Sequence, residues 1–450
     1  MPDSILFWND VALEAAKTDY STPDPSVDPT PQQPGPTAAS RAFAIVHVAM
    51  YDAYVGVRGG DTYLTYSAAD KPTTNDLLAA QAAVSAAAAL TLGELYSRQR
   101  QVFQNKLVSF VASLNGTDPK IAQGLAWGHL VARKLLDARA DDGSAALPNF
   151  YVAGPLPGRH RPDPLAPMQG FLGPEWGMVK PFGVENVVMR VPGTAPPPLN
   201  SAPYATAFGE VKAIGRLNST TRTPGQTAIG LFWAYDGSRN IGLPPRLYNQ
   251  VVRAIAQKVG PAGTSEAQNA RLFALINVAM VDAGIQAWYE KYVYNIWRPV
   301  VGIRESDAGW GPTGAGDGNN ATAGDPFWVP LGAPKTNQPG KIGFTPPFPA
   351  YPSGHATFGT AALVATQKEL NLADGFAFSL VSDELDGMAI DASGGQRPRQ
   401  VRPLTIKTAI EENLISRVYL GVHWKFDADE GERNGRKIGE LVQGKFPQMA

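Results

Sequence analysis

The sequence predicts a mainly α-helical protein, with two helix bundles side by side and long irregular loops rich in Pro and Gly. Apolar residues recur at helical spacing along most of the 450-residue chain, and few segments show the two-residue alternation of a strand. The 46 Gly and 39 Pro residues cluster in particular stretches. Because apolar residues make up 44% of the chain, these stretches are expected to be ordered loops of a folded protein.

The first predicted unit covers residues 1–203. An extended loop rich in Pro, Asp and Thr is expected over Ser21–Pro36, and a Pro- and Gly-rich surface crossing is expected over Pro148–Pro203. Thr74 is a suitable N-cap for the helical pattern that follows it, which predicts one long helix or two consecutive ones. The predicted helices of this unit are Thr37–Val57, Thr73–Asn115 and Asp118–Ala140.

The second predicted unit covers residues 204–450. Thr223 followed by Pro224 combines an N-cap with a proline at the first helical position, which is a good start signal. An irregular stretch is expected over Glu305–Pro352. The predicted helices of this unit are Tyr204–Leu217, Thr223–Ala234, Pro244–Val259, Ser265–Trp297, Ser353–Glu369, Asp383–Ala392, Leu404–Leu420 and Asp427–Lys445.

Composition excludes several classes of function. The formal net charge is -1, from 39 basic and 40 acidic residues, so nothing recommends a nucleic acid or an anionic membrane as partner. The absence of cysteine excludes disulfides, thiolate catalysis, zinc fingers and iron–sulfur clusters. Residues 1–11 make a poor signal peptide, and the Ala-rich run Leu77–Leu92 is expected to be a buried helix. A soluble protein of undefined compartment is expected.

The first of three polar clusters is Lys291-Tyr-Val-Tyr-Asn-Ile-Trp-Arg298-Pro299. On a continuous helix, Lys291 and Arg298 are two turns apart and share one face, with Trp288 one turn before Lys291. Pro299 makes Arg298 a boundary position. Taken alone, this cluster is also compatible with a solvated basic stripe.

The second cluster is Pro346-Pro-Phe-Pro-Ala-Tyr-Pro-Ser353-Gly354-His355, whose four prolines predict an extended approach to a helix. Ser353 is a natural N-cap, and the free N–H groups and positive dipole end of a helix N-terminus suit an oxyanion. Gly354 lets the backbone approach a ligand closely, and His355 is placed to give or take a proton near neutral pH. The alternative is an ordinary helix cap with an incidental histidine.

The third cluster is Ser416-Arg417-Val-Tyr-Leu-Gly421-Val-His423-Trp-Lys-Phe-Asp427. On an unbroken helix Arg417 and His423 would point well apart, so Gly421 is expected to end the helix and let His423 fold back toward the same pocket. Asp427 is placed to orient the imidazole through its other nitrogen. The alternative is a structural histidine.

Together the clusters predict one pocket for a tetrahedral oxyanion such as vanadate or phosphate. Three basic side chains, a hydroxyl, a glycine at a helix start and two histidines are unsuited to an apolar core, but they offer a trianion several charge-assisted hydrogen bonds. The other histidines are expected to be bystanders, with His47 and His129 packed within helices and His160 solvated. The pocket residues are Lys291, Arg298, Ser353, Gly354, His355, Arg417 and His423.

The order Lys-x6-Arg-Pro, Pro-Ser-Gly-His and Ser-Arg-x3-Gly-x-His-x3-Asp resembles the shared signature of vanadium-dependent haloperoxidases and type 2 phosphatidic acid phosphatases. The fungal chloroperoxidase type of haloperoxidase resembles the chain most closely, from about Leu231 to Asp427, and Phe232-Trp-Ala-Tyr-Asp236-Gly-Ser is a further matching stretch. The resemblance implies a vanadate cofactor, with hydrogen peroxide and a halide ion as substrates and room for a small organic halogen acceptor. The oligomeric state is left open.

Carried over residue by residue, the resemblance implies specific roles. His423 would bond the vanadium, and His355 would deprotonate hydrogen peroxide. Lys291 would also polarise the bound peroxide for attack by halide, and Asp236 matches a carboxylate that pairs with the arginine at position 417. Trp288 and Phe348 match aromatics of chloroperoxidases, which implies oxidation of chloride as well as bromide and iodide. The residues that would hold the vanadate oxygens are Lys291, Arg298, Ser353, Gly354 and Arg417.

Two other functions are compatible with the same pocket. An acid phosphatase of the same superfamily would use His423 as nucleophile and His355 to protonate the leaving group. A non-catalytic anion carrier would bind the oxyanion but would give His355 and Asp427 no task. The chloroperoxidase-like stretches around Asp236 and Phe348 favour the haloperoxidase.

Overall fold

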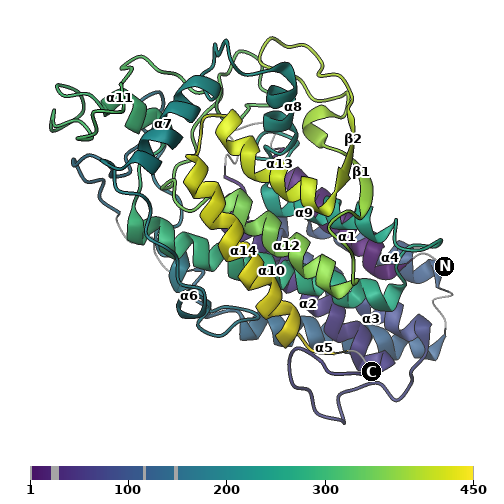
Figure 1. Ribbon diagram of the computed structural model, residues 1–450. Helices are drawn as coiled ribbons and strands as arrows, with labels where there is room; N and C mark the ends of the chain where they lie inside the picture. The colour runs from purple at the N-terminus through teal and green to yellow at the C-terminus, as the bar shows by residue number, and fades with distance from the viewer. Residues whose placement is uncertain (1–2, 22–29, 115–117, 146–150, 449–450) are drawn as a thin grey trace.

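The computed structural model describes residues 3–21, 30–114, 118–145 and 151–448, and these residues are mainly helical (Figure 1). Within these ranges the only strands are β1 (Ala377–Val381) and β2 (Val401–Thr405). They pair antiparallel, with Ala377 opposite Thr405. The prediction of a mainly α-helical protein is therefore confirmed.

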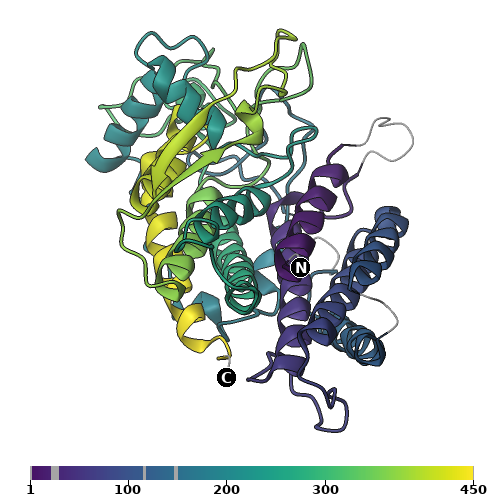
Figure 2. The ribbon, with the colours of Figure 1, turned by 90° about the vertical axis from the view of Figure 1, so that its right-hand side faces the viewer.

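Five helices lie within the first 138 residues of the chain, beside the helices that come later in the sequence (Figure 2). Helix α3 follows Asp76, whose side chain accepts a hydrogen bond from Leu78 N, so Asp76 and not the predicted Thr74 is the N-cap. Residues 22–29 of the predicted loop over Ser21–Pro36 lie outside the described residues. The helices are α1 (Ser4–Asp19), which was not predicted, α2 (Gly35–Arg58), α3 (Leu77–Leu95), α4 (Arg100–Ser113) and α5 (Pro119–Ala138).

The chain after residue 186 supplies the helices around the site. Thr223 caps α8 with a reciprocal hydrogen-bond pair to Gln226, and Pro224 is the first helical residue, as predicted. The helices are α6 (Val187–Arg190), α7 (Ala202–Ile214), α8 (Pro224–Phe232), α9 (Pro244–Ala256), α10 (Glu266–Tyr294), α11 (Pro299–Glu305), α12 (Gly354–Glu369), α13 (Ile406–Tyr419) and α14 (Lys425–Lys445). Short 3-10 turns are η1 (Ser97–Gln99), η2 (Trp176–Met178) and η3 (Asp383–Leu385).

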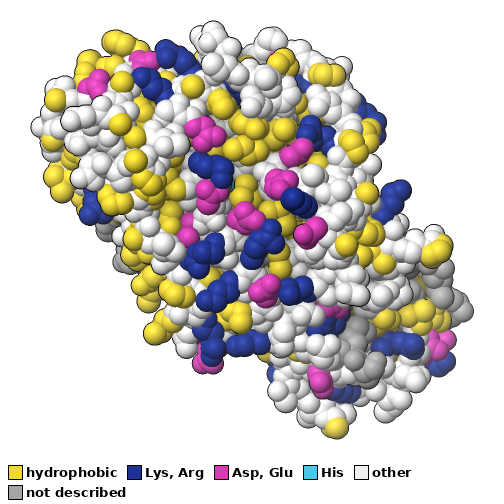
Figure 3. All heavy atoms as spheres, in the orientation of Figure 1, with side chains coloured by type: hydrophobic (Ala, Val, Ile, Leu, Met, Phe, Trp, Pro, Cys, Tyr) yellow, Lys and Arg dark blue, Asp and Glu magenta, His cyan; other side chains and the backbone are white. Residues whose placement is uncertain are grey.

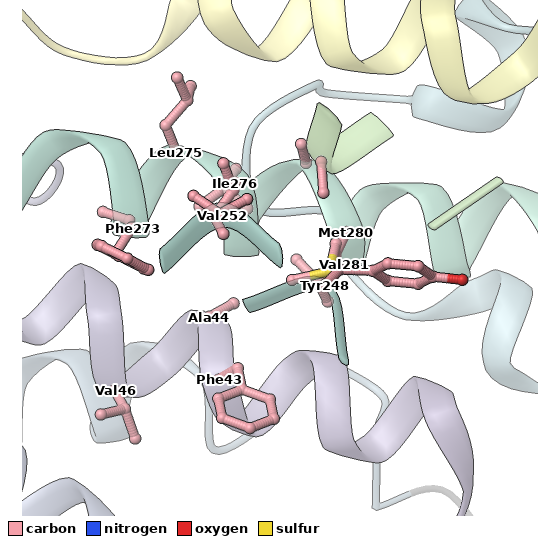
Figure 4. Close-up of a cluster of buried hydrophobic side chains, with 14 of the residues drawn as sticks. Phe43, Ala44, Val46, Tyr248, Val252, Phe273, Leu275, Ile276, Met280 and Val281 are labelled. Atoms are coloured by element: carbon pink, nitrogen blue, oxygen red, sulfur yellow. The ribbon is translucent and has the colours of Figure 1, made fainter. Parts of the chain in front are cut away.

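Helix α10 runs through the centre of the molecule and packs against α2 on one side and α12 and α14 on the other. Its apolar residues face all directions, which is typical of a buried helix. Figure 4 shows part of this core, where Phe43 of α2, Tyr248 and Val252 of α9 and Phe273 of α10 gather. Since α10 is packed against helices of both halves, the division into residues 1–203 and 204–450 stays a prediction.

Two helices, α3 and α10, are long and apolar enough to cross a membrane by length and composition alone. The fold itself buries 78% of the apolar window of α3 and 94% of that of α10. Both are therefore core helices, as predicted for the Ala-rich run. On the face that carries α12 and α14, basic and acidic side chains are interspersed (Figure 3), for example in the pairs of Lys425 with Asp429 and Arg436 with Glu432.

Helices α12 and α14 lie unusually close together because glycines of α14 face α12. A Cβ atom at Gly435 would lie 2.7 Å from the Thr357 carbonyl oxygen, and one at Gly431 would lie 2.7 Å from the Ser353 carbonyl oxygen. The Ser353 N–H donates to the Asp427 carbonyl oxygen at 2.8 Å. This close contact fixes the start of α12 against the first turn of α14, and both helix starts carry site residues.

Two of the predicted helices differ from the structure. Only η3 forms within the predicted helix Asp383–Ala392, because turns follow at Asp386 and at Gly387, whose φ of 90° is incompatible with a right-handed helix. The predicted helix Ser265–Trp297 ends at Tyr294, because Asn295 adopts a left-handed conformation with φ 57°.

Candidate active site

Residues of the second and third polar clusters line one cavity of about 220 Å³, together with residues of α2, α9 and α10. Four of the predicted residues, Lys291, Arg298, Ser353 and Asp427, are buried but are not among the residues that line the cavity. The predicted residues that do line it are Asp236, Trp288, Phe348, Gly354, His355, Arg417 and His423.

Lys291 and Arg298 reach the site by different routes from the one predicted. They do not share a helical face, because α10 ends at Tyr294 and Arg298 is the extended residue before α11, with φ -75° and ψ 155°. The structural reason is the left-handed Asn295 together with Pro299, which disfavours a helical conformation in the residue before it. Their side chains are nonetheless brought to the same segment, residues 348–352.

The Lys291 ammonium lies under the Pro-rich segment that leads to α12. It donates to the carbonyl oxygens of Pro349 at 2.9 Å and Ala350 at 3.1 Å, and also to that of Pro352. Its Nζ is 5.1 Å from the centre of the Phe348 ring. Burial, and then the neighbouring Arg298, hold the pKa of Lys291 well below its ordinary value. Lys291 therefore fixes the segment that positions Ser353. Among the described residues, the hydrogen-bond partners of Lys291 Nζ are backbone carbonyl oxygens and not carboxylates.

Arg298 connects the Pro-rich segment to His423. Its Nε donates to the Phe348 carbonyl oxygen at 2.8 Å, and its Nη1 donates to the Val422 carbonyl oxygen at 2.8 Å and lies 2.9 Å from His423 Nε2. Its Nη2 is buried and has no hydrogen-bond partner among the described residues. Burial lowers the pKa of Arg298 to about 9.

The contacts of His423 define its tautomer. A guanidinium can only donate, so His423 Nε2 accepts from Arg298 and the ring proton must be on Nδ1. Nδ1 lies 2.9 Å from Asp427 Oδ2, which also accepts the Trp424 N–H at 2.9 Å. Burial, and then Arg298, hold the pKa of His423 well below its ordinary value, so the ring is neutral. Asp427 therefore orients the imidazole through Nδ1, as predicted, and the Nε2 lone pair accepts from Arg298.

Gly421 places His423 in this position. Helix α13 ends at Tyr419, and Gly421 has φ 72°. A Cβ atom there would lie 2.4 Å from the Gly215 carbonyl oxygen, so the turn requires glycine for its conformation and for its space. The predicted end of the helix at Gly421 is confirmed to within a turn, and it allows Arg417 and His423 to line one cavity.

Arg417 and Asp236 form a two-pronged ion pair. Arg417 Nη1 donates to Asp236 Oδ2 at 2.9 Å and Nη2 donates to Oδ1 at 2.8 Å. The Arg417 side chain is 0% exposed and that of Asp236 is 6% exposed. The third donor, Arg417 Nε, is buried and has no partner among the described residues.

His355 lies in the first turn of α12 with its tautomer also defined. Its Nε2 is 2.6 Å from the Ala234 carbonyl oxygen, which can only accept, so Nε2 carries the proton and Nδ1 keeps its lone pair. Burial, and then Arg417, lower the pKa of His355 to about 3, so the ring is neutral near pH 7. Its backbone carbonyl accepts from Tyr248 and Asn413, each at 2.9 Å, which anchors this turn to α9 and α13.

Ser353 is the N-cap of α12, as predicted, and its Oγ accepts weakly from Ala356 N at 3.5 Å. At Gly354 a Cβ atom would lie 3.2 Å from the Trp288 ring, so a larger residue would be crowded against the cavity wall. The Trp288 and Phe348 rings are 4.8 Å apart and tilted by 49°. The first N–H groups of a helix have no partner within the helix, which suits this end of α12 to an anion.

The residues present are suited to an oxyanion. Three buried cations, Lys291, Arg298 and Arg417, face two buried carboxyl groups, Asp236 and Asp427. Burial raises the pKa of Asp427 to about 7, so negative charge in the site is weaker still. Two buried N–H donors, Arg298 Nη2 and Arg417 Nε, have no partner among the described residues. A buried donor without a partner costs about 1–3 kcal/mol, and an anion in the cavity would remove that cost.

Sequence reasoning missed or misplaced several residues. The predicted solvated His160 is fully buried instead, because the surface-crossing segment folds back, and His160 N donates to the Asn295 carbonyl oxygen at 3.0 Å. His47 is buried and bonded to Asn9, as predicted, whereas His129 is on the exposed side of α5. Lys335 lines the cavity and was not predicted, because it stands in an irregular stretch without a motif.

Comparisons with known proteins agree with this arrangement. Residues 2–169 match the family model described as the vanadium chloroperoxidase N-terminal domain, and residues 271–450 match the one described as the VCPO second helical-bundle domain. The vanadium chloroperoxidase of Curvularia inaequalis is 34% identical to this chain, over 94% of this chain and 79% of that protein. The chain therefore belongs to the vanadium chloroperoxidase family, within the vanadium-dependent haloperoxidases that its motifs resemble.

Two solved structures share the fold. A bacterial vanadium-dependent iodoperoxidase superposes with a TM-score of 0.76 and 24% identity, over 100% of this chain and 97% of that one. The apo form of a bacterial vanadium-dependent chloroperoxidase superposes with a TM-score of 0.63 and 16% identity, over 91% of this chain and 93% of that one. Both likenesses extend over both halves of the chain.

Proposed function

We propose that this protein is a vanadium-dependent haloperoxidase, which uses hydrogen peroxide to oxidise halide to hypohalous acid at a vanadate held by His423. The observation that carries this proposal is the fixed tautomer of His423. His423 donates its Nδ1–H to Asp427, so Nε2 carries the lone pair at the cavity, and this nitrogen would exchange its hydrogen bond from Arg298 for a bond to the metal. The family membership supports the same function.

The surrounding donors would hold the vanadate oxygens. Arg298 Nη2 and Arg417 Nε are buried donors without a partner in the described part of the chain, and the Gly354 N–H lies at a helix start that favours negative charge. The Ser353 hydroxyl is only weakly engaged and would turn toward the anion. Lys291 would contribute charge from behind Phe348, and a direct bond would require it to release one carbonyl. When bound, vanadate(V) supplies Lewis-acid activation of peroxide without a change in its oxidation state.

His355 is proposed as the group that moves the proton. Its Nε2–H is held by the Ala234 carbonyl, so Nδ1 is the nitrogen available to accept a proton from hydrogen peroxide. The lowered pKa keeps this nitrogen unprotonated near pH 7, so its lone pair can accept the proton. Asp236, whose Oδ1 lies 3.9 Å from His355 Nε2, would stabilise the resulting imidazolium.

The aromatic pair Trp288 and Phe348, beside the cavity, is relevant to which halides the protein oxidises. Trp288 and Phe348 cover Lys291, whose Nζ is 5.5 Å and 5.1 Å from their ring centres. An apolar cover keeps water from the cation and strengthens its effect on a bound oxygen. We propose that chloride, bromide and iodide are all oxidised.

The test is halogenation of a phenolic dye by purified protein given vanadate, hydrogen peroxide and bromide. We expect activity that requires vanadate and is suppressed by phosphate, because both anions compete for one site. His423→Ala should lose vanadate retention, and His129→Ala, an exposed histidine on α5, should behave as wild type. Rapid hydrolysis of p-nitrophenyl phosphate without halogenation would instead establish the phosphatase, and equal vanadate affinity in wild type and His423→Ala would refute the ligand assignment.

A further inference from the structure

The residues that line the active-site cavity fall into two chemically different groups. One group is polar and contains His355, Arg417 and His423. The other is apolar except for a single cation, and it contains Leu172, Leu243, Lys335, Phe344, Pro346 and Pro347. A vanadate and a halide ion require the first group only, because small hydrated anions gain nothing from apolar walls. The second group therefore needs a different occupant.

Lys335 is the charged member of the apolar group. It is half-buried, and its Nζ lies 3.9 Å from the centre of the Phe344 ring. Within the described part of the chain no carboxylate forms an ion pair with it, in contrast to Arg417. Burial lowers the pKa of Lys335, and the charge of Asp236 acts in the opposite direction. An ammonium held in this way over an aromatic ring is a binding group for an anionic ligand.

We propose that this apolar part of the cavity binds an aromatic carboxylate as the halogen acceptor, with its carboxylate on Lys335 and its ring against Phe344 and the Pro346–Pro347 wall. The inference rests on the proposed function. A cavity of about 220 Å³ leaves room for a single ring beside the oxyanion. An aromatic ring also matches the chemistry, because an electrophilic halogen needs an electron-rich carbon.

The proposed step is electrophilic aromatic substitution. The ring carbon uses its π electron pair to form the carbon–halogen bond while the oxygen–halogen bond of hypohalous acid breaks. The ring carbon then loses its proton, and this proton and the departing hydroxide form water. The halogen is reduced, the ring carbon is oxidised, and the hypohalous acid from the proposed activity is the only co-reactant.

The experiment measures binding of 4-hydroxybenzoate to the vanadate-loaded protein without peroxide, by saturation-transfer NMR and calorimetry. We expect saturable binding to wild type and at least a 10-fold weaker affinity in Lys335→Met, because the charge partner is lost. The control is Lys258→Met, an exposed lysine that follows α9 and does not line this cavity, and its affinity should stay within 2-fold. The neutral 4-hydroxybenzamide should bind wild type and Lys335→Met equally.

Phe344→Leu is a second variant that keeps the charge. It should weaken benzoate and benzamide binding alike by about 3- to 10-fold, since it removes the ring contact only. Absence of saturable binding to wild type, or equal benzoate affinity in wild type and Lys335→Met, would overturn the acceptor site. Iodide oxidation to triiodide needs no organic acceptor, so its absence in wild type would refute the proposed function separately.

Discussion

The two sides of the oxyanion site hold their cations in different ways. On one side, which we call the carbonyl side, Lys291 and Arg298 donate to backbone carbonyls of residues 348–352 and 422. On the other, the carboxylate side, Arg417 is paired through two hydrogen bonds with Asp236. All three cations are buried, so the difference lies in their partners and not in their exposure.

This difference predicts that one side contributes mainly to the stability of the fold and the other mainly to binding of the anion. A carboxylate neutralises the arginine on its side whether or not an anion is present, so that side is stable by itself. On the other side carbonyl dipoles accept hydrogen bonds from Lys291 and Arg298, but they do not neutralise a charge, and Arg298 Nη2 has no partner among the described residues. The carbonyl side is therefore expected to depend on the anion, whereas the carboxylate side is expected to support the fold. Variants of the two sides test this division.

The largest effect is expected when the carboxylate side loses its cation. Arg417→Met should lower the free energy of unfolding of the anion-free protein by about 3–5 kcal/mol, because Asp236 would remain buried without its partner. Adding Asp236→Asn should recover part of this loss, since it removes the unpaired charge. Denaturant unfolding followed by circular dichroism measures both values. If the double variant is less stable than Arg417→Met, the pair does not have the role assigned to it.

Much of the fold could be predicted from local signals. Pro224 after Thr223, and Ser353 before Gly354, are start signals that depend on neighbouring residues, and both helices begin there. The predicted helix Asp383–Ala392 failed because turn-forming Asp386 and Gly387 outweigh its apolar spacing. The short β1–β2 pair was missed because its strands have only five residues each, and pairing across the chain leaves little local trace.

The site could be predicted as a set of residues but not as a set of contacts. Motif spacing brought Lys291, Arg298, Arg417 and His423 together, yet the carbonyl partners of Lys291 depend on a segment 58 residues away in sequence. His160 looked solvated between two arginines, and only the packing of its loop on Asn295 buries it. Contacts of this kind come from tertiary structure, which carries no local pattern.

On the carbonyl side we expect a smaller change in stability and a clear loss of binding. Arg298→Met should weaken vanadate affinity by more than about 100-fold, close to 3 kcal/mol, because it removes the free Nη2 donor and its charge. The unfolding free energy without anion should fall by only about 1–2 kcal/mol, since no carboxylate is left unpaired. Equilibrium dialysis with vanadate, and thermal unfolding with and without it, give the two quantities.

The matched control for this prediction is Arg304→Met. Arg304 lies on α11, the helix that begins directly after Arg298. Its Nε also donates to a backbone carbonyl oxygen, that of Trp328, at 2.9 Å. It has no place in the site, so its loss should leave vanadate affinity unchanged. A loss of affinity as large as that of Arg298→Met would mean that the carbonyl-held arginines act through folding and not through charge.

The smallest expected effect concerns the proton on His355, which lies between the two sides. Burial and Arg417 lower its pKa to about 3 in the anion-free site, and an oxyanion would raise that pKa by favouring the imidazolium. Binding should therefore take up as much as one proton. Affinity should rise by up to about tenfold per pH unit as pH falls through the raised pKa, and level off near pH 3.

Calorimetry of phosphate binding in two buffers with different ionisation enthalpies measures this proton uptake. The same measurement on His355→Gln gives the protons that phosphate itself exchanges, and this number is subtracted from the wild-type uptake. Equal uptake in the variant and in wild type would show that the anion does not raise the pKa of His355, and the expected coupling between the oxyanion and this proton would then fail.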